Sequence, residues 1–182
     1  HIALGSPFLN DKCLIDLPGG KIINHPKQFH VNNKLEPGAV TDWPTTRLKD
    51  GTAHNLSRVP GKDFFSYDQS YITEMPVGWY GITNRDIGVG FGVAFSDIYK
   101  YLWYWQSLGG GTGYPWYGRT YNIGLEPFTS YTNEGLGTAI DNGTALLVEA
   151  GQEVQSSVTA VAYESSKGIE GISQSGDINL KK

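Results

Sequence analysis

Hydrophobic and polar positions alternate with a period of two along much of the chain. The clearest stretch is 87–95, in which large apolar side chains take every odd position and Gly or Ala takes every even one. Such alternation predicts a strand with one buried face. The other face is nearly bare and would let a second backbone or a ligand approach closely. The stretch 101–106 repeats the pattern and places Trp103 and Trp105 on one face.

Further strands are predicted wherever a short apolar or alternating run ends at turn residues. These runs lie at 13–17, 21–23, 71–75, 78–84, 121–126, 144–148 and 158–163. No long amphipathic helix with caps is present. The connection between 87–95 and 101–106 is short, so we expect these two strands to be neighbours. Many short strands with almost no helix predict an all-β fold, an antiparallel β-sandwich.

The chain is long enough for one domain, with 182 residues. We assign 1–164 to the β-sandwich and 165–182 to a polar, glycine-containing tail that we expect to be partly mobile. The stretch 24–66 holds four prolines and few strand signals. It predicts a long loop region packed over a rim, where binding residues often lie. Because the chain begins at His1 without an initiator Met, we expect a cleaved, trimmed or truncated protein.

Composition narrows the classes of partner. The net charge is −4, and no cluster of Lys and Arg supports nucleic-acid binding. No apolar run is long enough to span a membrane. The single cysteine, Cys13, excludes an internal disulfide; a cytoplasmic location fits, although a secreted protein without disulfides fits too. Aromatic residues reach 13%. Most would fill the core as strand formers, but sugar C–H groups also stack on such rings.

We expect neither a metal nor a cofactor. The four histidines, His1, His25, His30 and His54, lack the spacing of a zinc site. The last three are better explained by surface or hydrogen-bonded roles. The glycine-rich run at 109–113 lacks the Lys-Ser/Thr ending of a phosphate loop, and we expect it to form a flexible lip beside the Trp103/Trp105 strand.

Glu126 is the most informative carboxylate. It lies in an apolar stretch with β-type alternation, 123–128. A carboxylate in such a place is either paired with a cation or held with a raised pKa as a general base. Considered alone, the residues slightly favour a structural ion pair, with Arg119 as the partner.

Three segments resemble the aldose 1-epimerase (galactose mutarotase-like) superfamily, particularly its less-characterised bacterial members. They are LWYWQ at 102–106, GYPWYGR at 113–119 and NIGLEP at 122–127, within a similarity that extends over 1–163. The resemblance implies a large antiparallel β-supersandwich of which this chain would be the C-terminal half. It also implies an aldose substrate whose ring opens and recloses.

The resemblance implies a set of site residues as well. Glu126 matches the glutamate that removes the proton from the anomeric hydroxyl, and His1 matches the histidine that protonates the ring oxygen. Asp68, in an Asp-x-x-aromatic segment, matches an aspartate that binds sugar hydroxyls. The remaining substrate-binding candidates lie in the same similar segments; they are Trp103, Trp105, Gln106 and Arg119.

Three functions follow, in decreasing order of support. The first is an aldose 1-epimerase that interconverts sugar anomers through a Glu base and a His acid. The second is a non-catalytic carbohydrate-binding or sensing protein on the same scaffold, and the third is an interaction protein without a ligand. A supersandwich cut near its middle leaves strand edges uncovered. We therefore expect a homodimer, or a complex with an N-terminal portion of the same protein.

Overall fold

The computed structural model describes every residue from His1 to Lys182 and confirms the predicted all-β, antiparallel fold. Only one α-helix, α1, interrupts the strands, apart from a 3-10 turn at Lys62–Phe64. The elements are β1 (Ala3–Gly5), β2 (Cys13–Asp16), β3 (Lys21–Asn24), β4 (Val40–Asp42), β5 (Thr45–Arg47), β6 (Ala53–Asn55), β7 (Ser66–Thr73), β8 (Trp79–Asn84), β9 (Val89–Phe95), β10 (Tyr101–Leu108), β11 (Tyr121–Phe128), α1 (Leu136–Asp141), β12 (Val158–Glu164), β13 (Ile169–Ile172) and β14 (Ile178–Leu180).

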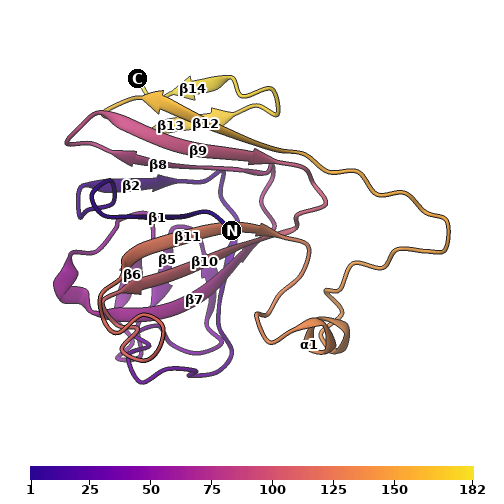
Figure 1. The fold of residues 1–182 in the computed structure, drawn as a ribbon, viewed down its shortest axis with the longest axis horizontal. Helices are drawn as coiled ribbons and strands as arrows, with labels where there is room; N and C mark the ends of the chain where they lie inside the picture. The colour runs from indigo at the N-terminus through magenta and orange to yellow at the C-terminus, as the bar shows by residue number, and fades with distance from the viewer.

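Two main sheets enclose the core (Figure 1). One has six strands in the order β1-β11-β10-β7-β3-β4, and the other has four in the order β12-β9-β8-β2. Every strand pair in both sheets is antiparallel. Sixteen buried residues form one apolar cluster between the sheets, thirteen from their strands and three, Leu9, Leu56 and Val59, from loops. Those of the six-stranded sheet include Ile22, Ile72, Leu102, Tyr104, Ile123 and Leu125.

The expectation that 87–95 and 101–106 are neighbouring strands is wrong. Both runs are strands, β9 and β10, but they belong to different sheets. The short connection at 96–100 carries the chain from the four-stranded sheet to the six-stranded one instead of forming a hairpin. Alternation identifies a strand and its buried face, whereas it does not identify the strand that lies beside it.

The bare glycine face of β8 and β9 is filled by the chain itself. A Cβ placed on Gly90 would lie 2.0 Å from Tyr163 Cε2 of β12, and one on Gly92 would lie 2.4 Å from Ile172 of β13. Close approach is therefore the reason for glycine here, but the groups that approach are side chains of β12 and β13 and not the second backbone or ligand that we expected. Residues 165–182, which we expected to be a polar tail, contain the β13–β14 hairpin with Ile169 and Ile172 buried.

The segment 144–148 is not the strand that its sequence predicts. It follows α1 without any strand pairing, and Leu146, Leu147 and Val148 are exposed. Figure 1 shows α1 and the chain up to β12 standing out from the two sheets as an arm. We call residues 134–157 the arm.

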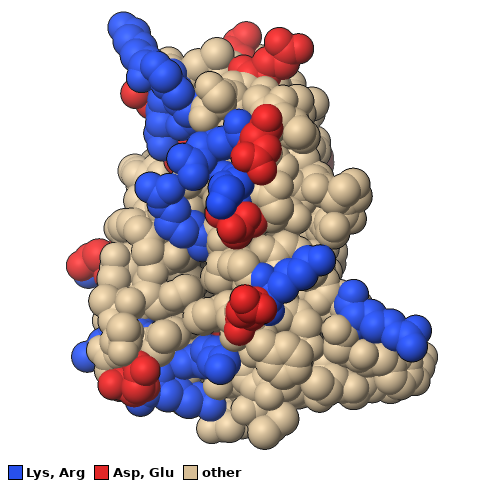
Figure 2. All heavy atoms as spheres, turned by 90° about the vertical axis from the view of Figure 1, so that its left-hand side faces the viewer, with Lys and Arg blue, Asp and Glu red and all other residues tan.

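Charge is unevenly distributed over the molecule. Figure 2 shows Lys and Arg side chains gathered, with Asp and Glu among them, on the side of the molecule opposite the arm. Between Arg119 and Lys167 the chain contains no Lys or Arg at all. The arm carries four carboxylates, those of Glu134, Asp141, Glu149 and Glu153, so it is both acidic and partly apolar.

Candidate functional site

One face of the six-stranded sheet points away from the core and carries most of the predicted site. Opposite residues of an antiparallel pair share a face, and Tyr71, Trp103 and Glu126 lie opposite one another across β7, β10 and β11. Leu102 and Tyr104 belong to the core, so the alternate positions of β10 point the other way. We call this side of the sheet the outer face.

Glu126 and His1 are in direct contact on the outer face. His1 Nδ1 lies 2.9 Å from Glu126 Oε2. Only 6% of Glu126 is exposed, whereas the His1 side chain is 71% exposed. Burial raises the pKa of the Glu126 carboxyl above its usual range. The charge of the N-terminal amino group opposes this rise, and solvent reaches the neighbouring imidazole.

Aromatic rings flank Glu126, as the sequence predicts. Trp103, its cross-strand neighbour, stacks on Phe128 with 3.7 Å between ring centroids, and its indole N–H donates to the Ser130 carbonyl at 2.7 Å. Trp105 lies two residues along the same face and contacts the rings of Tyr67 and Trp116. Glu126 and both tryptophans are thus brought together on one face by the register of β10 and β11.

Asp68 and Gln106 are not part of this group. They lie opposite each other in the β7–β10 pair, at positions that alternate with those of the outer face. Both are buried beside the core. The sheet therefore separates them from Glu126, although the sequence predicts one shared sugar site.

The contacts of Asp68 are those of a structural anchor. Its Oδ1 accepts the backbone N–H groups of Lys34 and Leu35 at 2.9 and 3.1 Å, and its Oδ2 accepts the Gln106 side-chain amide at 3.3 Å. Burial raises the pKa of the Asp68 carboxyl, and these hydrogen bonds oppose the rise. The adjoining hollow has a volume of only about 10 Å³, which suits at most one water molecule. Asp68 therefore holds the 24–39 loop against β7.

Arg119 lies away from Glu126 and forms no ion pair with it. Its side chain is exposed on the connection 109–120, which follows β10 and leads to β11. His1 has taken the position of ion-pair partner that the sequence suggests for Arg119. The same connection carries Trp116, which packs on Trp105 with 5.2 Å between ring centroids.

The sequence does not predict a cluster of hydrogen-bonded side chains next to Trp103. The Tyr71 hydroxyl donates to Asn133 Oδ1 at 3.3 Å, and His25 Nε2 lies 3.1 Å from the same oxygen. These contacts fasten Asn133, which directly precedes the arm, to β7 and to the residue that follows β3. Alternation of Tyr67, Gln69 and Tyr71 along β7 could have placed Tyr71 on the outer face, but Asn133 lies in a loop that gives no such signal.

Of the other histidines, His30 has the hydrogen-bonded role that we expect, whereas His54 is half-buried and its Nε2 has no hydrogen-bond partner. His30 Nδ1 accepts the backbone N–H of Asn32 at 3.1 Å. His54 stacks on Phe64 with 4.8 Å between ring centroids, and burial lowers its pKa. No group of three or more His, Cys, Asp and Glu residues is placed to hold a metal ion.

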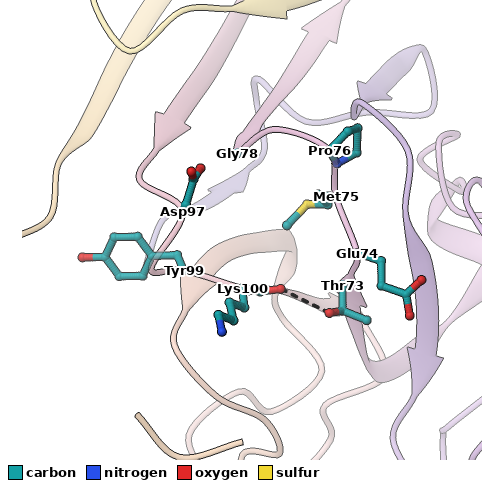
Figure 3. A pocket seen from close by; sticks show the side chains of 8 residues that line it. All are labelled: Thr73, Glu74, Met75, Pro76, Gly78, Asp97, Tyr99 and Lys100. Atoms are coloured by element: carbon teal, nitrogen blue, oxygen red, sulfur yellow. Dashed lines mark hydrogen bonds between the residues drawn. The ribbon is translucent and has the colours of Figure 1, made fainter. Parts of the chain in front are cut away.

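A second hollow lies at the end of the sheets, where the chain crosses twice between them (Figure 3). It has a volume of about 450 Å³ and is formed by the β7–β8 and β9–β10 connections. Glu74, Asp97 and Lys100 supply its charges, and the Thr73 hydroxyl donates to the Lys100 carbonyl at 3.3 Å. None of the predicted sugar-binding residues lines it.

No protein-family model, no curated protein and no solved structure matches this chain. No helix in it is long and apolar enough to cross a membrane.

Proposed function

We propose that the outer face binds an aldose and that Glu126 and His1 interconvert its anomers, as in an aldose 1-epimerase. The observation that carries the proposal is the contact between His1 Nδ1 and Glu126 Oε2 at 2.9 Å, on the face that also bears Trp103 and Trp105. A base and an acid are the groups that ring opening requires, and aromatic rings can orient the sugar. The two sheets around one core also fit a portion of a galactose mutarotase-like supersandwich.

In the proposed reaction the Glu126 carboxylate takes the proton of the anomeric hydroxyl. The bond between C1 and the ring oxygen breaks, its electron pair moves to the ring oxygen, and C1 becomes a carbonyl. The His1 imidazolium gives its proton to that oxygen. After rotation about C1–C2 the ring closes on the other face of the carbonyl, Glu126 returns its proton, and His1 regains its own. Proton transfer of this kind accelerates a reaction by about 10²- to 10⁴-fold.

The raised pKa of Glu126 suits the part of a base. A carboxylate whose conjugate acid is weaker accepts a proton more readily. The tryptophans would orient the sugar, since its C–H groups pack on aromatic faces. His1 is mostly exposed, so its side chain can move away from Glu126 to admit a ring between them.

A second candidate is a non-catalytic carbohydrate-binding protein on the same scaffold. It is favoured by the same contact, because side chains 2.9 Å apart leave no room for a sugar ring between them. In this case Glu126 accepts hydrogen bonds from sugar hydroxyls, and His1 fixes the carboxylate.

Polarimetry of α-glucose and α-galactose, together with saturation-transfer NMR, separates the two candidates. We expect the wild-type protein to accelerate mutarotation, and Glu126→Gln to remove the acceleration while the thermal midpoint stays within a few degrees. The amide keeps the shape of the side chain but cannot accept the proton. Binding without acceleration would establish the second candidate, and equal turnover by both proteins would refute the role of Glu126 as base. Absence of both binding and turnover would exclude both candidates.

A further inference from the structure

Gly124 lies directly beneath the Glu126 carboxylate on the outer face. It is opposite Trp105 in β10 and opposite Ala3 in β1. Glu126 is the next residue of β11 on this face, and its side chain folds back along the strand. A Cβ built on Gly124 would lie 2.7 Å from Glu126 Oε1 and 3.4 Å from Trp105 Cε3. The carboxylate therefore occupies space that any other residue at 124 would fill.

The backbone does not require glycine at this position. Gly124 is paired on both sides within the sheet, and its φ lies outside the left-handed region. Most side chains are compatible with such a conformation. A glycine in the middle of a strand also weakens it relative to Ala. The structural reason for glycine at 124 is therefore the space that the Glu126 carboxylate occupies.

A contact below 3.0 Å to a Cβ cannot persist, so a side chain at 124 must displace its neighbour. The neighbour here is the far end of a flexible side chain, so the backbone can stay in place while the carboxylate moves. Displacement would carry Oε1 away from β11 and disturb the contact between Oε2 and His1, since the two oxygens belong to one rigid group.

We propose that Gly124 is a positioning residue, whose missing side chain holds the Glu126 carboxylate in contact with His1. Its catalytic consequence rests on the function proposed above, whereas the contact itself can be tested without any sugar. The inference predicts that substitution at 124 disturbs the carboxylate in proportion to side-chain size. It also predicts that the disturbance acts only through Glu126.

The test uses Gly124→Ala and Gly124→Val, with Gly171→Ala as the matched control. Gly171 is also a strand glycine, and a Cβ built on it meets nothing within 4 Å. Long-range ¹H–¹⁵N spectra of the histidine rings report the bond at His1 Nδ1, whose signal is identified by its loss in His1→Gln. We expect both Gly124 variants to shift this signal toward its position in Glu126→Gln, Val more than Ala. Gly171→Ala should leave it unchanged.

Turnover and a double variant complete the test. If the wild-type protein accelerates mutarotation, Gly124→Ala should lower kcat at least tenfold without lowering the thermal midpoint. In a Glu126→Ala background, where no carboxylate is left to displace, the same substitution should have no further effect on the His1 signal. An unchanged His1 signal in both Gly124 variants would overturn the inference, as would an effect that persists without Glu126. If no aldose turns over, the proposed function fails, but the His1 signal still decides the role of Gly124.

Discussion

Asp68 on β7 and Glu126 on β11 are both buried carboxylates, but their contacts give them different roles. Asp68 and Glu126 are 2% and 6% exposed, and burial raises the pKa of each. Asp68 accepts three hydrogen bonds from N–H groups within the protein, so few of its lone pairs are available to a ligand. Glu126 instead meets the imidazole of His1, which solvent reaches. Only the second arrangement leaves a carboxylate beside a side chain that solvent reaches, as the proposed function requires.

The raised pKa of Glu126 predicts a pH profile for the proposed reaction. Only the carboxylate form accepts a proton, so the rate falls as pH falls through the pKa of Glu126. Because burial raises this pKa, the acidic limb of kcat/KM should lie above the usual value of about 4.3 for Glu. Polarimetry from pH 4 to 8, corrected for spontaneous mutarotation, measures the limb. A limb at or below the usual Glu value would contradict this assignment.

Asp68 predicts a loss of stability without a specific loss of chemistry. Asp68→Ala leaves the buried N–H of Leu35 and the partly buried N–H of Lys34 without their acceptor, and a buried donor left in this way costs about 1–3 kcal/mol. We therefore expect the free energy of unfolding to fall by about 2 kcal/mol or more in urea titrations. Asp68→Asn should lose less, because its side-chain oxygen can still accept both N–H groups. Equal stability of wild type and Asp68→Ala would show that the loop is held by other contacts.

The Asp68 carboxyl also predicts how the difference in free energy of unfolding between wild type and Asp68→Asn changes with pH. Its pKa is raised in the folded state, so the folded protein binds the proton more tightly than the unfolded chain. This contribution is complete below the unfolded pKa of about 3.9 and is lost as pH rises through the folded pKa. Wild type should therefore lose stability relative to Asp68→Asn over that interval. Urea titrations of both proteins at several pH values measure the difference, and parallel curves would contradict it.

At the scale of elements, alternation predicts faces well and partners poorly. It identifies β8 to β11, only the last three residues of β7, and the shared face of Trp103 and Trp105, because side chains alternate strictly along a strand. Alternation along β10 already places Gln106 on the opposite face from Trp103 and Trp105. The face on which Asp68 lies relative to them can be known only from the register of β7 on β10. The segment 144–148 has a strand's composition but no strand beside it. Pairing depends on the whole fold, which the local pattern does not contain.

The glycine face of β9 supplies a prediction at this scale. Gly90→Ala places a methyl group within about 2.1 Å of the Tyr163 ring, and the Tyr163 hydroxyl is held by Thr83 at 2.8 Å. The ring cannot move without losing that hydrogen bond, so overpacking should cost about 1–3 kcal/mol. Thermal denaturation against Gly171→Ala, which meets open space, measures the loss. Equal midpoints for the two variants would mean that β12 can shift freely on β9.

At the scale of the whole molecule, the arm is the feature that exposes a cluster of apolar side chains to solvent in a single copy. Leu136 and Ile140 of α1 lie near Leu146 and Leu147 around a hollow of about 370 Å³, and all four are exposed. Clustered exposed apolar side chains of this kind mark interaction surfaces. Beside the arm, β12 forms an edge of its sheet and contains no Lys or Arg, so it lacks the usual charged protection against pairing.

We predict that the protein associates with a second copy through the arm and the edge of β12. A two-fold dimer is the expected form, since it buries the same surface on both copies. It would bring the arm carboxylates of the two copies near each other, so added salt should strengthen association by screening their repulsion. Light scattering at micromolar concentration in low and high salt measures this.

A pair of variants tests the surface itself. Leu147→Glu, at a position 74% exposed in the single copy, should yield monomers without lowering the thermal midpoint of the monomer. Val31→Glu, at an exposed position outside the arm, should remain associated. A monomeric wild type at both salt concentrations would contradict the prediction.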